Sequence, residues 1–150
     1  MYNVFVERHL PIALKLILTF TILGTLFSGY LVVVGLFGGS CGLSKGCPLF
    51  LGYSACWSGL ALHILSLILC VLIAKDHITF KNGLMSIVLA TLLGIGLSGY
   101  FTMIELPAFM QKGFGAYALG VPPCFFELVF FMLTFLTATL ASAYERDHNR

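Results

Sequence analysis

Long apolar runs separated by short polar segments dominate the chain. Four runs of mostly apolar residues span roughly Ile12–Leu36, Leu51–Ala74, Leu84–Ile104 and Val121–Tyr144. About 20 such residues are what an α-helix needs to cross the hydrocarbon core of a bilayer. The pattern therefore predicts an all-α integral membrane protein, a four-helix bundle that forms a single polytopic domain over residues 1–150.

The composition agrees with a lipid environment. Hydrophobic residues make up 59% of the chain and charged residues only 9%, whereas a soluble domain carries about 25% charged residues. A surface exposed to water needs more charged residues than this. The composition therefore predicts that the chain is surrounded by the lipid bilayer. The same scarcity of charge argues against nucleic acid as a partner.

The basic residues predict an orientation, because cytoplasmic loops of membrane proteins carry an excess of Lys and Arg. Two basic residues fall on one side of the predicted bundle, Lys45 and Lys112. Six fall on the other side: Arg8, Lys15, Lys75, Lys81, Arg146 and Arg150. We therefore expect both termini in the cytoplasm and the cysteine-bearing loops on the outer face, where disulfides persist.

Two short motifs occur twice in the same order. The segment TILGTLFSGY (21–30) matches TLLGIGLSGY (91–100) at six of ten positions, with a spacing of 70 residues. The segment LGYSAC (51–56) is similar to LGVPPC (119–124), with a spacing of 68 residues. Two motifs that recur in one order at nearly one spacing indicate an internal duplication.

The duplication predicts two parallel helical-hairpin repeats, over about 12–74 and 84–144. Sites in such membrane proteins often lie at the interface of the repeats. Cys56 and Cys124 occupy equivalent positions, each at the start of the second helix of its hairpin on the outer face. Whether these two helices are adjacent or diagonal in the bundle is left open by the sequence.

A stripe of small residues also recurs in the first helix of each hairpin. Gly24, Ser28 and Gly35 correspond to Gly94, Ser98 and Glu105. Small residues let membrane helices approach closely, so helix packing is the favoured interpretation. Glu105 ends the third apolar run, and its position is that of an interfacial residue.

Glu127 is the single most informative residue for chemistry. It lies one turn inside the fourth run, where a carboxylate is expensive and indicates function by default. It follows Cys124 by three residues, so the two side chains share a helix face. The alternative is a hydrogen-bonded packing residue. His63 shares the face of Cys56, but a local hydrogen bond explains it better than a cofactor does.

The remaining cysteines have simpler interpretations. Cys41 and Cys47 are separated by five residues, and a disulfide between them closes a small loop without strain. Such a bond is either a structural staple or a redox-active pair, and spacing alone does not separate the two. Cys70 lies deep in the second run and reads as a small buried hydrophobe. Metal binding by Cys56, His63, Cys124 and Glu127 is disfavoured, because the helical rise places His63 about 10 Å deeper than Cys56.

Taken in order, these features resemble the vitamin K epoxide reductase family. The segment GGSCGLSKGCPLFLGYSACWSGL (38–60) is similar to the family's outer loop leading into its second helix, and GLSGYFTMIEL (96–106) is similar to a pattern in its third helix. The similarity covers most of the chain by the pattern and order of features. It implies a four-helix membrane core that oxidises thiols of a partner protein on the outer face and passes the electrons to a quinone.

By position, the resemblance implies that Cys41 and Cys47 are the shuttle pair and that Cys124 is the first cysteine of the family's CxxC beside the quinone. The chain departs from the family at that motif, because it reads CFFE and Glu127 occupies the second cysteine position. One solution pairs Cys56 with Cys124 across the bundle and uses Glu127 as a proton acceptor. Thiol–disulfide exchange needs only an accessible thiolate and a reachable disulfide.

Two other functions stay open at this point. The chain is alternatively a non-catalytic four-helix scaffold or an accessory subunit of a larger membrane complex, able to bind a lipid or a quinone. A third class is a protein that handles a metal or another small solute. The first of these alternatives predicts copurification with complex subunits, and the second predicts a bound metal that is lost when Cys124 or Glu127 is replaced.

Overall fold

The computed structural model describes residues 3–38, 49–50, 53–113 and 122–148. Almost all of these residues belong to four α-helices: α1 (Asn3–Gly38), α2 (Ala55–Ala74), α3 (Phe80–Lys112) and α4 (Pro123–His148). Two short antiparallel strands, β1 (Leu49–Phe50) and β2 (Tyr53–Ser54), precede α2. The predicted all-α bundle of four long apolar helices is confirmed.

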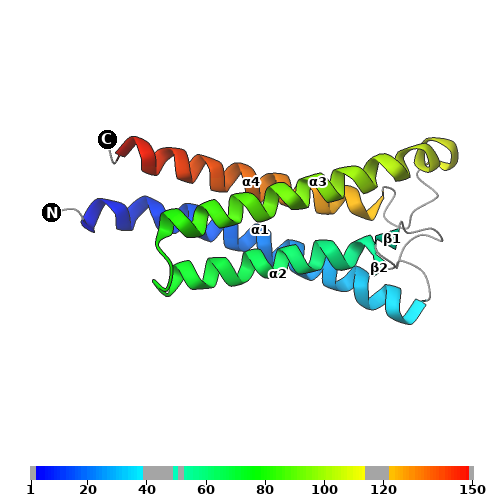
Figure 1. Cartoon of the computed structure of the whole chain (residues 1–150), viewed down its shortest axis with the longest axis horizontal. Helices are drawn as coiled ribbons and strands as arrows, with labels where there is room; N and C mark the ends of the chain where they lie inside the picture. Colours follow the sequence, from blue (N-terminus) through cyan, green and yellow to red (C-terminus); the bar gives the residue numbers. More distant parts are fainter. Residues whose placement is uncertain (1–2, 39–48, 51–52, 114–121, 149–150) are drawn as a thin grey trace.

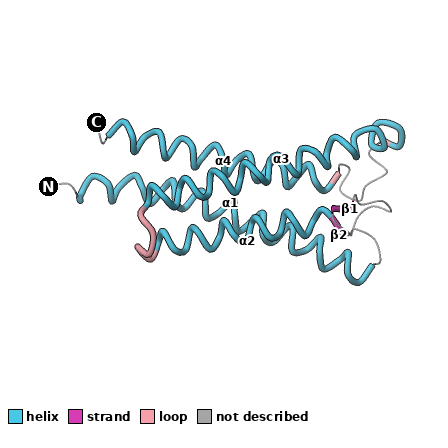
Figure 2. Tube along the Cα trace, viewed as in Figure 1, coloured by secondary structure: helices cyan, strands magenta, loops and turns pink. Residues whose placement is uncertain are grey.

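The helices form a ring in which each packs against two neighbours, in the order α1, α2, α3, α4 and back to α1. The helices α2 and α4 are therefore diagonal partners, a choice that the sequence left open. The start of α1 and the end of α4 lie at the same end of the bundle as the turn between α2 and α3, at the left in Figure 1. We call this the turn end. The opposite end, where β1 and β2 lie, is called the strand end (Figures 1 and 2).

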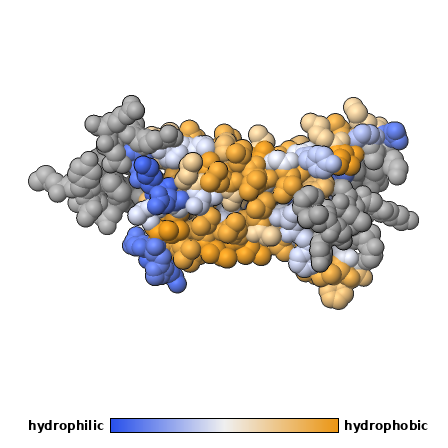
Figure 3. Space-filling model, in the orientation of Figure 1, coloured by the Kyte–Doolittle hydropathy of each residue, from blue (hydrophilic) through white to orange (hydrophobic). Residues whose placement is uncertain are grey.

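The outer surface of the bundle is apolar. Each helix contains a stretch long and apolar enough to cross a membrane, and Figure 3 shows an apolar band along the bundle with hydrophilic residues gathered at the turn end. Large side chains such as Leu26, Leu93 and Leu140 stand well out from the bundle. These observations indicate an integral membrane protein whose helices face lipid.

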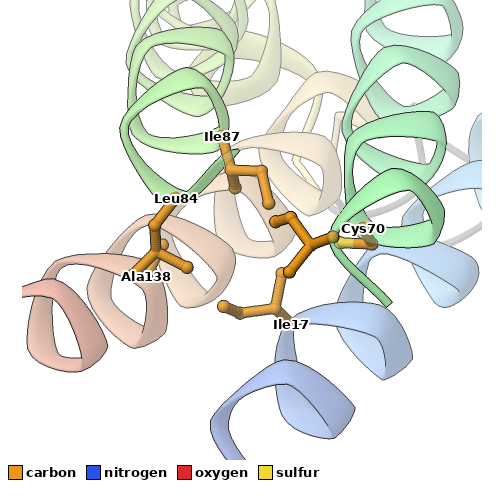
Figure 4. Close-up of a cluster of buried hydrophobic side chains, with 6 residues drawn as sticks. Ile17, Cys70, Leu84, Ile87 and Ala138 are labelled. Carbon is orange, nitrogen blue, oxygen red and sulfur yellow. The ribbon is translucent and has the colours of Figure 1, made fainter. Parts of the chain in front are cut away.

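A compact apolar core closes the turn end. Figure 4 shows side chains from all four helices meeting there. Its buried members are Ile17, Cys70, Ile73, Leu84, Ile87 and Ala138. In lipid, close packing rather than water exclusion holds helices together, and Cys70 fills space here as a small hydrophobe, as the sequence predicted.

The turn between α2 and α3 is short and polar. Asp76 adopts a left-handed backbone conformation with φ 56°. The N–H of Asp76 donates to the carbonyl of Ile73, and the N–H of His77 donates to the carbonyl of Leu72. This pair of bonds is the Schellman arrangement that ends many helices. It reverses the chain within a few residues, so α3 returns alongside α2.

The third helix is longer than its apolar run predicts. The apolar run ends at Ile104, but α3 continues through Pro107 to Lys112. Membrane helices tolerate an internal proline when the surrounding protein satisfies the backbone group it frees. The helix ends at Gly113, whose φ of 67° suits glycine, and the Gly113 N–H donates to the Phe109 carbonyl over 2.8 Å.

Burial along the helices recurs at the spacings of the sequence motifs. Buried, half-buried and exposed positions follow the same order over 21–30 in α1 and 91–100 in α3. The same holds, position by position, over 56–70 in α2 and 124–138 in α4. Residues 70 or 68 apart therefore occupy comparable environments in the bundle.

Candidate functional site

The interior of the bundle carries many polar side chains. Among the described residues, the buried ones are Thr21, Ser28, His63, Ser66, Thr91, Ser98, Glu105, Glu127 and Thr134. Four of their hydroxyl groups donate to a carbonyl one turn earlier on the same helix, over 2.7–2.9 Å: those of Thr21, Ser66, Thr91 and Thr134. Such back-bonding satisfies a hydroxyl donor inside its own helix, so these residues need no further partner.

Four of the other buried side chains have polar atoms without a hydrogen-bond partner. The atoms are Ser28 Oγ, His63 Nε2, both carboxyl oxygens of Glu105 and Oε1 of Glu127. Leaving a buried polar group unsatisfied costs about 1–3 kcal/mol, and native proteins do so in few places. The concentration of such atoms between the middle of the bundle and the strand end identifies the candidate site.

Glu127 is buried one turn into α4 and is only 2% exposed. The diagonal helix α2 presents Gly59 to it, and a Cβ atom at Gly59 would overlap the Glu127 carboxyl group. The carboxyl group thus fills the space that a glycine leaves open. Ser28 on α1 lies beside the same carboxyl group, without a hydrogen bond of good geometry between them.

Glu105 is also buried among the helices, at 5% exposure, while its interfacial depth in the membrane stays a prediction. It lies on α3 one turn closer to the strand end than Phe101, which packs against Cys124. Helical side chains lean toward the N-terminus of their own helix. Since α3 and α4 run in opposite directions, the side chains of Glu105 and Glu127 lean toward each other, and their charges are close enough to interact.

Cys56 and Cys124 begin α2 and α4 at the strand end, and each is 1% exposed. Cys56 packs against Leu31 of α1, while Cys124 packs against Ala55 of α2 and Phe101 of α3. Neither cysteine faces lipid. Both are therefore held in the interior by contacts with the neighbouring helices.

The two thiols and the two carboxyl groups form one group of acidic side chains. Cys124 is within electrostatic reach of Glu105, Glu127 and Cys56, and Cys56 is within reach of both carboxyl groups. We call these four residues the thiol–carboxyl layer. Three helices contribute to it, and no one of them contains more than two of its members.

The layer includes three of the five sequence-predicted site residues. Cys56, Cys124 and Glu127 lie within it, whereas Cys41 and Cys47 lie outside the described residues. Cys124 is a free thiol in the structure.

His63 lies closer to the turn end than the layer does and has a packing role. Its imidazole stacks on the Phe131 ring with centroids 4.0 Å apart and planes 3° from parallel. Gly24 of α1 lies against the other face of the imidazole, because a Cβ there would overlap the ring. Gly94 of α3 lies against Phe131 in the same way. The local hydrogen bond favoured by the sequence is not confirmed, because His63 Nε2 has no hydrogen-bond partner and the ring is held by stacking.

The thiols of the layer are proton and electron donors, and its carboxyl groups exchange protons. Within the described parts of the chain, no group of three or more His, Cys, Asp or Glu side chains is arranged to hold a metal ion. Two thiols release two protons and two electrons on forming a disulfide. The two carboxyl groups beside them are suitable acceptors for the protons.

Sequence reasoning missed Glu105 and Gly59 as members of the site. A signal for both was present in the repeat, because Gly35 stands where the other half has Glu105, and Gly59 stands where it has Glu127. Each carboxyl group therefore belongs to the second half, and the matching position of the first half has no side chain. That asymmetry distinguishes a site from a uniform packing stripe.

Comparisons of the chain with models of protein families, with curated proteins and with solved structures find no match.

Proposed function

We propose that the protein is a membrane thiol–disulfide oxidoreductase in which Cys56 and Cys124 form the redox pair that reduces a quinone. The observation that carries the proposal is the thiol–carboxyl layer, in which two buried thiols lie within electrostatic reach of each other and of two carboxyl groups. A buried ionisable group in a membrane protein is expensive and marks a pathway or a site by default. Four such groups from different helices in one layer support chemistry more than packing.

The proposed reaction is balanced within the site. The thiols of Cys56 and Cys124 form one disulfide and give up two electrons and two protons. The Glu127 carboxylate accepts a thiol proton, and one quinone takes up the two electrons and two protons to become a quinol. The quinone approaches from the bilayer, where Trp57 and Phe125 follow the two cysteines and are partly exposed on the lipid-facing side. Aromatic side chains of this kind offer a face on which a quinone ring stacks.

In this proposal Cys41 and Cys47 deliver the electrons. The segment that carries them joins α1 to β1, and both of these elements meet the strand end (Figure 1). The exchange would take electrons from a thiol-bearing protein on the outer face and pass them to the buried pair. The strand end then faces outward and both termini are cytoplasmic, which agrees with the excess of basic residues assigned to the turn end.

We further propose that the site arose at the interface of two duplicated parallel hairpins. Cys56 packs against Leu31, and Cys124 packs against Phe101. The cysteines are 68 residues apart and their packing partners are 70 apart, which are the two spacings of the sequence motifs. These matched contacts support the duplication, as does the matched order of burial along the helices.

The test uses the full chain, reduced and purified into lipid nanodiscs, and mixed with a short-chain ubiquinone analogue without oxygen. Absorbance follows quinol formation, and mass spectrometry maps the disulfides. We expect a Cys56–Cys124 bond to form with one quinol for each protein, and a second quinol to form once Cys41 and Cys47 pass their two electrons to that pair and form their own disulfide. Cys124→Ser and Cys56→Ser should each abolish this bond and its quinol, whereas Cys70→Ser, a buried cysteine of the turn-end core, should keep both.

The opposite result is also informative. If the two thiols remain reduced while the quinone is stable, or if Cys124→Ser reduces quinone as fast as the native chain, the redox assignment is wrong. The bundle is then a scaffold or an accessory subunit that uses its polar interior for packing or for lipid binding.

A further inference from the structure

The two carboxyl groups of the thiol–carboxyl layer have oxygen atoms that receive no hydrogen bond. Three of their four oxygens lack a hydrogen-bond partner, and so does the Ser28 hydroxyl beside Glu127. Ser28 is completely buried, and Glu127 is almost so. The Ser28 hydroxyl and the Glu127 carboxyl group lie within reach of each other, and the carboxyl oxygens without a hydrogen-bond partner are free to share a ligand.

The three lysine side chains whose burial is described do not supply that partner. Lys15, Lys75 and Lys81 are exposed, and the last two flank the turn between α2 and α3, at the opposite end of the bundle from the layer (Figure 1). Buried charges in proteins are normally paired or bound to an ion. A positive charge that pairs with ionised Glu105 and Glu127 therefore comes from outside these residues.

The Glu127 side of the site is built to hold its carboxyl group in place. Gly59 leaves the space into which the Glu127 carboxyl group fits. The Glu105 side chain leans toward Glu127 from α3. Oxygen atoms from a hydroxyl and from carboxylates are the ligands that hard cations prefer. Ion sites in repeat-built membrane proteins also lie at the interface of the repeats.

We propose that Glu105, Glu127 and the Ser28 hydroxyl form a buried site for one small monovalent cation, either an alkali-metal ion or an ammonium group. The cation supplies the charge that the two carboxyl groups lack and the partner that the Ser28 oxygen lacks. This proposal concerns ion binding by the carboxyl groups and stands whether or not the two thiols react with quinone.

The experiment measures thermal unfolding of the full chain in nanodiscs of uncharged phosphatidylcholine, followed by the fluorescence of Trp57, the single tryptophan. Sodium, potassium, ammonium and methylammonium chlorides are compared with choline chloride at constant ionic strength. We expect at least one small cation to raise the unfolding temperature saturably, by roughly 5 °C. A response to sodium or potassium identifies an alkali-metal site, and a response confined to the ammonium salts identifies an amine site.

Matched variants locate the effect. Glu105→Gln and Glu127→Gln should each remove the response, while Glu145→Gln, near the other end of α4, should keep it. Ser28→Ala should weaken the apparent affinity about tenfold, and Ser98→Ala, the matching buried serine of the other half, should leave it unchanged. The proposal is overturned if the unfolding temperature is the same in choline and in all four salts. It is also overturned if Ser28→Ala and one of the two glutamine variants both keep the cation-dependent rise of the native chain.

Discussion

Gly24→Ala is expected to destabilise the bundle by about 2–3 kcal/mol, whereas Gly96→Ala is expected to leave it unchanged or to stabilise it by about 0.5–1 kcal/mol. The two glycines differ in what a methyl group would meet. At Gly96 nothing lies within 4 Å of the added Cβ. At Gly24 the Cβ would lie 2.6 Å from Nδ1 of the His63 ring.

The His63 ring has nowhere to move. It is stacked face to face on Phe131, and Phe131 is itself pressed against Gly94, where a Cβ would lie 2.6 Å from Cδ1 of its ring. A glycine from α1 and a glycine from α3 thus enclose two stacked rings from α2 and α4. Widening either side forces helices apart, and rigid interiors resist such overpacking.

Equilibrium unfolding of both variants in mixed detergent micelles provides the measurement. The repeat supplies an internal check, because Leu26 stands at the position that matches Gly96 and points away from the bundle. Equal stability of Gly24→Ala and Gly96→Ala would contradict the enclosed stack.

The second large effect on stability is expected from exchanging Gly59 of α2 and Glu127 of α4, which are in contact although the two helices are diagonal in the bundle. Gly59→Glu should destabilise the protein by about 3 kcal/mol or more, because it places a second carboxyl group where the Glu127 carboxyl group already lies. Glu127→Gly should also be destabilising, by about 2–4 kcal/mol, because it leaves a cavity and an internal helix glycine.

The double variant Gly59→Glu/Glu127→Gly should recover most of the combined loss. The transferred carboxyl group enters the space vacated on α4, and Ser98 then occupies the place that Ser28 has in the native chain. Because the two residues are in contact, their effects should be strongly non-additive, by about 2 kcal/mol or more. The same unfolding assay measures all three variants, and strictly additive losses would show that positions 59 and 127 are not equivalent.

Much of the fold follows from the sequence because length and hydropathy alone decide which helices cross a membrane. The apolar runs Ile12–Leu36 and Leu84–Ile104 fall within α1 and α3, whereas α2 begins four residues after the run at 51–74 begins and α4 begins two residues after the run at 121–144 begins. The end of α3 does not follow, because Glu105 and Pro107 interrupt the apolar run while the helix continues. An acid and a proline lower the local hydropathy, which predicts the end of the membrane-spanning segment, although Glu105 is buried in the bundle and the helix continues to Lys112.

The candidate site follows only in part. The three-residue spacing of Cys124 and Glu127 and their position in an apolar run predict a shared buried face. The placement of Glu105 in the same layer depends on the opposite directions of α3 and α4, which no local pattern contains. The role of Gly59 depends on the diagonal contact of α2 with α4, and the sequence left that arrangement open.

Disulfide trapping tests the central claim most directly, namely that Cys56 and Cys124 face each other inside the bundle. The variant Cys41→Ser/Cys47→Ser/Cys70→Ser retains only these two cysteines and is oxidised in membranes with copper phenanthroline. A parallel variant keeps Cys70 and carries Ala138→Cys, a pair with the same 68-residue spacing in the turn-end core. We predict an intramolecular Cys56–Cys124 bond, identified by mass spectrometry of the monomer. The claim would be contradicted if the parallel variant forms the bond between Cys70 and the cysteine at position 138 while the first variant forms no bond between Cys56 and Cys124.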